Sequence, residues 1–151
     1  ITLPTQPKEF YPMPKTKEEI VSSESNTMKI RLESFPEIFI LSNANMKYLS
    51  PVLITMRATM PDNSYDMWLR FHNSIKEGDI HFSEVDKFWF REAYDGGHKV
   101  YSLVHSDDFR ITIKSIDKVK HSCDIYFQGH LQSGSSAPKL WATGKINIQG
   151  E

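Results

Sequence analysis

Six polar or aromatic side chains in the last third of the chain have the types and spacing of a ligand-binding surface. They alternate with apolar residues along two extended runs, so in strands they would share one face of a sheet. They are Tyr126, Gln128, His130, Trp141, Thr143 and Lys145. If residue 130 lies opposite residue 141 in an antiparallel pair, Trp141 lies beside His130. A tryptophan and a tyrosine among hydrogen-bonding groups can hold a sugar ring or a protein partner.

The same face also has a purely structural interpretation. A second sheet, or the segment before residue 27, could cover it, and Trp141 and Tyr126 would then belong to the core. A two-layer fold has to cover only one face of each sheet, which favours an exposed surface. The N-terminal segment is available as a cover, which favours the opposite. The sequence leaves both interpretations open.

Catalytic motifs that are recognisable from local sequence are missing. The chain has no Gly-rich phosphate loop, no HExxH and no GxSxG. The acids Asp79, Glu84 and Asp124 could serve a glycoside hydrolase only if two of them faced each other across a cleft. The sequence does not establish such a pairing. We therefore predict a protein without enzymatic activity and keep a hydrolase as the third interpretation.

The histidines raise the question of a metal site. They are His72, His81, His98, His105, His121 and His130. None pairs with another at the spacing of metal ligands, and all lie near polar faces or strand ends. His105 is followed by Asp107 and Asp108, but aspartates after a strand more often cap a turn than bind calcium. We predict no metal and no cofactor.

Length and composition restrict the class of protein. A chain of 151 residues suggests one domain with a real core. The formal net charge of −1 argues against a nucleic-acid partner. No apolar run approaches the roughly 18 residues that a membrane helix needs. The single cysteine, Cys123, excludes an intrachain disulfide and a multi-cysteine metal site, and its place on an apolar face predicts a buried thiol.

Three runs in this part of the chain have a two-residue period, at 109–116, 123–131 and 140–148, and the binding residues lie in the last two. Short polar connections between such runs indicate an antiparallel meander. One register keeps every apolar side chain of the first two runs on one face. It pairs Phe109 with Gly129, Ile111 with Phe127, and Ile113 with Ile125.

Earlier strands are predicted over residues 28–32, 38–41, 52–60, 65–71, 88–94 and 98–104. Residues 42–45 are predicted to form a turn. The segment 82–94 could begin with a short helix, although the Asp-Gly turn that follows it favours a strand over 88–94. Turn signals every 8–12 residues or so are typical of a sandwich or barrel. We predict an all-β fold, a two-sheet antiparallel β-sandwich of about eight or nine strands with at most one short helix.

The sandwich is predicted over residues 27–151, and the proline-rich residues 1–26 are predicted to be a tether or linker. The alternative is a small-ligand β-barrel of lipocalin type, in which the apolar face surrounds a cavity. Large apolar side chains such as Phe109, Ile125 and Phe127 favour a filled core.

A basic run over residues 114–121 contains Lys114, Lys118 and Lys120. Its simplest interpretation is the solvated tip of a hairpin. Contact with an anionic surface is the second interpretation.

From Met67 to Gly150 the order of features resembles a layout found in small exported bacterial domains, often lipoproteins. In that layout a strand ending in Asp precedes a strand with a central Gly, and the last strand ends in a Gly followed by alternating apolar residues. Here these are Asp117, Gly129 and the run from Gly144 to Ile148. The resemblance implies a β-sandwich and export to the periplasm or cell surface, and it implies no catalytic residue.

We accordingly predict a non-enzymatic binding module of an exported bacterial protein. Its partner would be a protein or a carbohydrate, not a nucleic acid, and it would bind to a sheet face or to loops.

Overall fold

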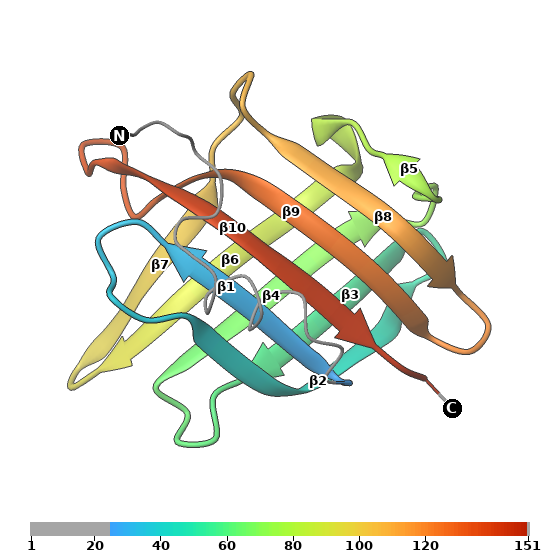
Figure 1. Cartoon of the computed structure of the whole chain (residues 1–151), viewed down its shortest axis with the longest axis horizontal. Helices are drawn as coiled ribbons and strands as arrows, with labels where there is room; N and C mark the ends of the chain where they lie inside the picture. The colour runs from blue at the N-terminus through green and yellow to red at the C-terminus, as the bar shows by residue number, and fades with distance from the viewer. Residues whose placement is uncertain (1–24, 151) are drawn as a thin grey trace, which may run out of the picture.

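The computed structural model describes residues 25–150, which form ten β-strands and one turn of 3₁₀ helix (Figure 1). The bounds are β1 Thr27–Leu32, β2 Phe39–Ser50, β3 Leu53–Thr59, β4 Tyr65–His72, β5 Gly78–Asp79, η1 Phe82–Glu84, β6 Val85–Tyr94, β7 Gly97–Leu103, β8 Arg110–Asp117, β9 Ser122–Gln132 and β10 Lys139–Ile148. The predicted all-β class is confirmed. The predicted tether, residues 1–26, lies outside the described residues except for its last two positions. Within residues 25–150, no helix has the length and apolar character required to cross a membrane.

The sheet closes on itself into an eight-stranded antiparallel barrel. Its order is β10-β1-β2-β3-β4-β6-β7-β9, and β9 pairs again with β10 to complete the ring. The predicted two-sheet sandwich is therefore wrong. Alternation of apolar and polar residues indicates only that one face of each strand is buried. The buried faces pack against one another inside a barrel just as they do between the two sheets of a sandwich. The sequence pattern is the same in both cases, so it could not distinguish them.

Strand β9 holds the closure together. One edge pairs with β10 along its length, from Cys123 to Gln132. The other edge is shared, because β8 pairs with it up to Gln128 and β7 pairs only with Leu131 and Gln132. Strands β8 and β5 therefore continue the sheet beyond the ring, and Figure 1 shows β8, β9 and β10 crossing in front of β3, β4 and β6.

The interior of the barrel is filled by apolar side chains. The largest of the fully buried ones are Phe71, Phe90, Met28, Ile30, Leu32, Leu41, Ile54, Met56, Met67, Leu69 and Ile75. Each contributes about 1.5–3 kcal/mol by leaving water, so burial on this scale is the main source of stability. The expectation of a filled core is met at Ile125 and Phe127, which are both buried.

The predicted register of the meander is confirmed at two of its three pairs, and the third, Phe109 with Gly129, lies before the start of β8. Ile111 lies opposite Phe127, and Ile113 lies opposite Ile125. In the next pair of strands, Trp141 lies opposite His130, as the binding-surface hypothesis requires. The sequence did not reveal the irregularity in β8 between residues 113 and 115. It leaves the apolar face intact on both sides.

Of two local predictions, the turn at residues 42–45 and the strand at residues 88–94, the structure confirms only the second. The turn predicted at residues 42–45 is wrong, because β2 continues through it with a β-bulge against β3. Asn43 takes a positive φ of 55° there, and the Asn45 side-chain amide donates to the Asn43 carbonyl at 3.1 Å. Asparagine tolerates this conformation in bulges as well as in turns, so its presence was ambiguous. The strand predicted over residues 88–94 is confirmed within β6, which follows the single 3₁₀ turn.

Candidate functional site

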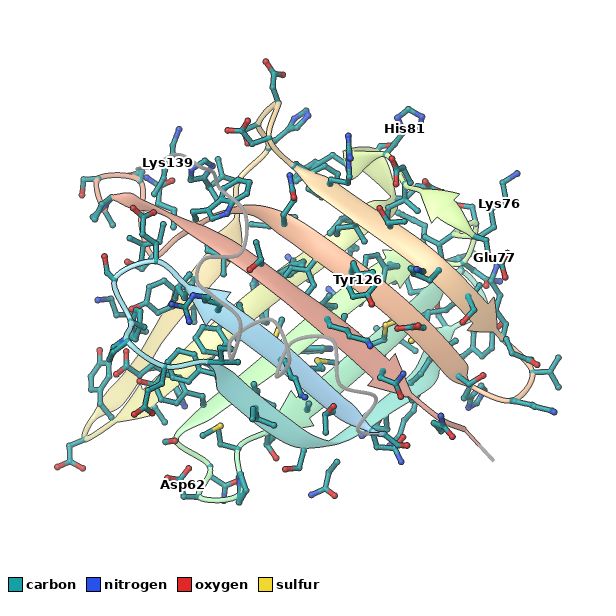
Figure 2. All side chains as sticks on the ribbon, in the orientation of Figure 1. Asp62, Lys76, Glu77, His81, Tyr126 and Lys139 are labelled. Atoms are coloured by element: carbon teal, nitrogen blue, oxygen red, sulfur yellow. The ribbon has the colours of Figure 1, made fainter. Side chains whose placement is uncertain are left out.

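Along each strand, the side chains that alternate with the interior residues point to the outside of the barrel. There they form two separate faces. The front face in Figure 1 is built by β8, β9, β10 and β1, and the back face by β3, β4 and β6. Tyr126 projects outward from β9 on the front face (Figure 2). The six residues predicted to bind a ligand all lie on this front face, on β9 and β10.

Trp141 and His130 form the aromatic centre of the front face. Their rings meet edge to face, with centroids 5.1 Å apart and an interplanar angle of 68°. Both residues are half-buried. Next to them, the Gln128 side-chain amide donates to the Asp108 carbonyl at 3.3 Å, and His130 Nδ1 lies 3.9 Å from the Asp108 carboxylate. A ring edge, an imidazole, an amide and a carboxylate therefore converge on one patch.

Tyr126 forms a second group on the same face. The ammonium groups of Lys114 and Lys145 lie 5.2 Å and 5.3 Å from the centroid of its ring, within cation–π range. Lys145 and Thr143 are each only 6% exposed, although they point away from the interior. The part of the predicted surface that solvent reaches is therefore Tyr126, Gln128, His130 and Trp141, which we call the β9–β10 patch.

Sequence reasoning missed an aromatic pair on the back face. Trp68 on β4 and Trp89 on β6 are register partners, and their rings are 5.1 Å apart at 81°. The Arg57 guanidinium lies 4.9 Å from the centroid of the Trp68 ring, and Arg70 lies 5.6 Å away. Lys87 lies 5.5 Å from the centroid of Trp89. The alternation in β4, which puts Trp68 on the side of Asp66 and Arg70, was the signal that could have revealed it.

An ion-pair network fixes this back face. Arg91 donates to both carboxylate oxygens of Asp66 at 2.9 Å, and Arg57 approaches the same carboxylate at 3.8 Å. The indole N–H of Trp68 is buried and has no hydrogen-bond partner in the described structure. The cations over both rings mean that this aromatic pair is already engaged by the protein's own side chains.

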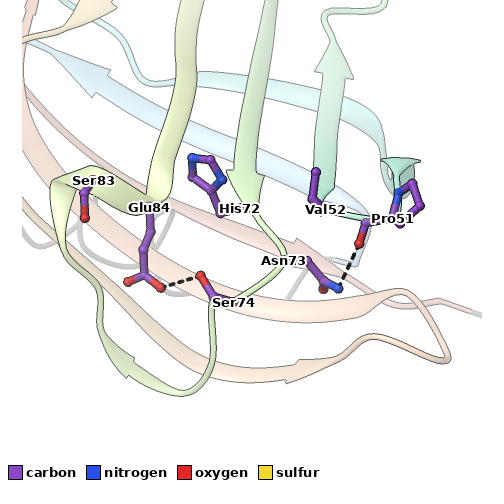
Figure 3. A pocket seen from close by; sticks show the side chains of 7 residues that line it. All are labelled: Pro51, Val52, His72, Asn73, Ser74, Ser83 and Glu84. Carbon is purple, nitrogen blue, oxygen red and sulfur yellow. Dashed lines mark hydrogen bonds between the residues drawn. The ribbon is translucent and has the colours of Figure 1, made fainter.

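An open hollow of about 600 Å³ lies at one end of the barrel, between the β2–β3 turn, the end of β4 and η1 (Figure 3). It gathers a serine, a histidine and a carboxylate, the residue types of a hydrolase. The Ser74 hydroxyl donates directly to Glu84 at 3.0 Å. A catalytic triad needs the histidine between the two, and no hydrogen bond among the described residues joins His72 to either. This geometry gives no support to the hydrolase interpretation.

A second, polar hollow of about 490 Å³ lies beside the end of β10. Asp124 and Asn147 face each other there in register, and each has a buried side-chain oxygen without a hydrogen-bond partner. As for metals, no group of three or more histidine, cysteine or acidic side chains in the described part of the chain is placed to hold an ion.

Comparisons with protein-family models, with curated proteins and with solved structures return no match. The functional argument therefore depends on the geometry of this chain alone.

Proposed function

We propose that this barrel is a non-enzymatic carbohydrate-binding module whose site is the β9–β10 patch. The observation that carries the proposal is the position of the tryptophans. All three lie on the outside of a barrel whose interior is filled by other residues. The ring of Trp141 meets a histidine, whereas cationic side chains lie over the rings of Trp68 and Trp89. A large aromatic side chain kept out of an apolar interior is more useful to binding than to folding.

The neighbours of Trp141 suit a sugar better than an apolar partner. A sugar ring presents C–H groups on its face and hydroxyls on its rim. Trp141 offers an aromatic surface, while Gln128, His130 and the exposed Asp108 offer donors and acceptors next to it. The amide and the carboxylate can bind neighbouring hydroxyls, which fixes the orientation of a ring held by stacking. The export implied by the resemblance would bring this patch into contact with cell-surface glycans.

The test is a glycan array probed with the folded domain, followed by calorimetry on any hit. Trp141→Ala should weaken binding at least about tenfold, as expected for an aromatic hot spot. Trp89→Ala is the matched control, because it removes an outer tryptophan from the other face and should leave binding unchanged. Equal binding by wild type and Trp141→Ala would overturn the proposal. A pull-down that captures a protein through Trp141, with an empty array, would replace the sugar by a protein partner.

A second candidate is the small-ligand barrel, favoured by the closed eight-stranded ring. Four methionines, Met28, Met46, Met56 and Met67, are among the buried residues that fill the interior. Methionine repacks more easily than branched side chains, so an apolar ligand could enter only by displacing them. Fluorescence titration with an apolar dye distinguishes the candidates. Saturable binding that is lost in Met56→Phe and retained in Trp141→Ala would favour the interior site.

A further inference from the structure

Exposed apolar side chains gather at one end of the barrel. Among the described residues, the large apolar side chains most exposed to solvent are Tyr48 at 41%, Leu49 at 53%, Val52 at 63%, Tyr94 at 57% and Val119 at 91%. All of these except Tyr94 lie at the end formed by the β2–β3 turn and the β8–β9 hairpin, on the right in Figure 1. We call Tyr48, Leu49, Val52 and Val119 the barrel tip.

The segments that carry the barrel tip are tied together through the loop after β4. The Asn73 backbone N–H donates to the Val52 carbonyl at 2.8 Å, and its side-chain amide donates to the Pro51 carbonyl at 3.3 Å. From the β8–β9 hairpin, Lys118 Nζ donates to the Asn73 carbonyl at 2.6 Å. The ring of Tyr48 meets that of His121 at 5.9 Å. The apolar side chains therefore project from one connected surface.

Lysines surround this surface. Lys47, Lys76 and Lys120 are exposed, and Lys76 projects from the same end of the barrel in Figure 2. Acids lie at this end as well. Asp117 accepts from the backbone N–H groups of Val119 and Lys120 at 3.0 Å, and Glu84 lines the hollow beside the β2–β3 turn. Glu77 is exposed beside Lys76. The opposite end carries charges of both signs, among them Asp62 and Lys139 (Figure 2) and Asp95. The exposed apolar side chains of the barrel tip therefore share their end of the barrel with three exposed lysines.

We propose that the barrel tip docks on the surface of an anionic lipid bilayer, with the apolar side chains entering the interface and the lysines facing lipid headgroups. The three exposed lysines around the apolar side chains favour an anionic surface. The shape of the tip selects a bilayer over a folded acidic protein. Val119, in the turn of the β8–β9 hairpin, has almost its whole side chain in water, at 91% exposed. A fluid interface accepts separate protruding side chains, whereas a protein partner must supply a shaped pocket for each.

Docking through this end leaves the β9–β10 patch free, because the patch lies on the side of the barrel. The inference therefore stands without the proposed sugar-binding function. It also gives a function to the lysines of the hairpin over residues 114–121, which a merely solvated hairpin tip would not need.

The experiment is cosedimentation of residues 1–151 with vesicles of phosphatidylcholine alone or mixed with phosphatidylglycerol. We expect binding to the mixed vesicles only, weakened by high salt. Val119→Asp and Leu49→Asp should each reduce the partition coefficient about tenfold or more, and Lys47→Gln or Lys120→Gln about fivefold each. The matched controls are Tyr94→Asp and Lys139→Gln at the opposite end, which should bind like wild type.

Three outcomes would overturn the proposal. One is equal binding to neutral and anionic vesicles, and another is equal loss in the tip and control variants. The third is binding to soluble polyglutamate as tight as to vesicles and insensitive to Val119→Asp, which would replace the bilayer by an acidic macromolecule. Circular dichroism of each variant checks that the barrel is folded. Val119→Asp should not affect folding, because the native side chain is 91% exposed.

Discussion

Gly144 offers a sensitive test of how the barrel closes. It lies on β10 with its Cα facing the interior, opposite Ile30 of β1 on one side and Phe127 of β9 on the other. A Cβ atom at this position would collide with the Lys29 backbone carbonyl and with the ring of Phe127. Gly144→Ala therefore adds one methyl group at the junction of three strands that the sequence alone did not bring together.

The magnitude follows from those two collisions. Overpacking a core by a methyl group costs about 1–3 kcal/mol when neighbouring side chains can shift. One of the two neighbours here is backbone held in the β1–β10 ladder, so we expect the upper end, about 3 kcal/mol. For a domain of this size that corresponds to a fall in the melting temperature of about 10 °C.

Thermal and urea unfolding, followed by circular dichroism, would measure this loss. Gly134→Ala is the matched control, because a Cβ there has no neighbour within 4 Å, and it should change stability by less than about 0.5 kcal/mol. In the background of Phe127→Leu, the same Gly144→Ala change should cost less, since only the carbonyl contact remains. A Gly144→Ala protein as stable as wild type would refute the described packing of β1, β9 and β10.

Three further predictions concern particular side chains. Burial raises the pKa of the Cys123 thiol from 9.0 to about 12. The folded state thus keeps a proton that the unfolded chain loses above pH 9. Relative to Cys123→Ala, the free energy of unfolding of the wild type should therefore fall by about 1.4 kcal/mol per pH unit between pH 9 and 12. Urea titration at each pH measures it. Asp66→Asn should cost about 1 kcal/mol, a value reduced by the partial exposure of Arg91, and a double-mutant cycle with Arg91→Gln should recover the coupling. Asn43→Gly should be close to neutral, whereas Asn43→Val should cost about 1–3 kcal/mol because of the positive φ, and equal effects would contradict the bulge.

The sequence revealed the strands where their alternation was strict. In β8 and β9 the apolar set could stay dry in only one register, and Ile111 does lie opposite Phe127. The same strictness located the outer position of Trp141 beside His130. Alternation carries no information about which non-consecutive strands pair. The β1–β10 ladder, which decides between barrel and sandwich, joins residues more than a hundred positions apart and could not be predicted from local pattern.

The candidate site was predictable only in part for a similar reason. The two-residue alternation along β9 and β10 correctly placed six side chains on one face. The burial of Thr143 and Lys145 on that outer face is a property of the assembled fold. The Trp68–Trp89 pair was missed because its members lie on strands separated by the β5–η1 segment, and no local motif joins them. The barrel tip likewise brings together segments far apart in the sequence, through the loop at Asn73 and the contact between Tyr48 and His121.

The most direct test of the central claim, that the β9–β10 patch binds a sugar, is fluorine NMR of protein labelled with 5-fluorotryptophan. The three tryptophans give three resonances, assigned with Trp68→Phe, Trp89→Phe and Trp141→Phe. On titration with a glycan selected from the array, we predict that the Trp141 resonance shifts and saturates while those of Trp68 and Trp89 stay in place. A shift at Trp68 or Trp89 with an unmoved Trp141 would contradict the account and place the ligand on the back face of the barrel.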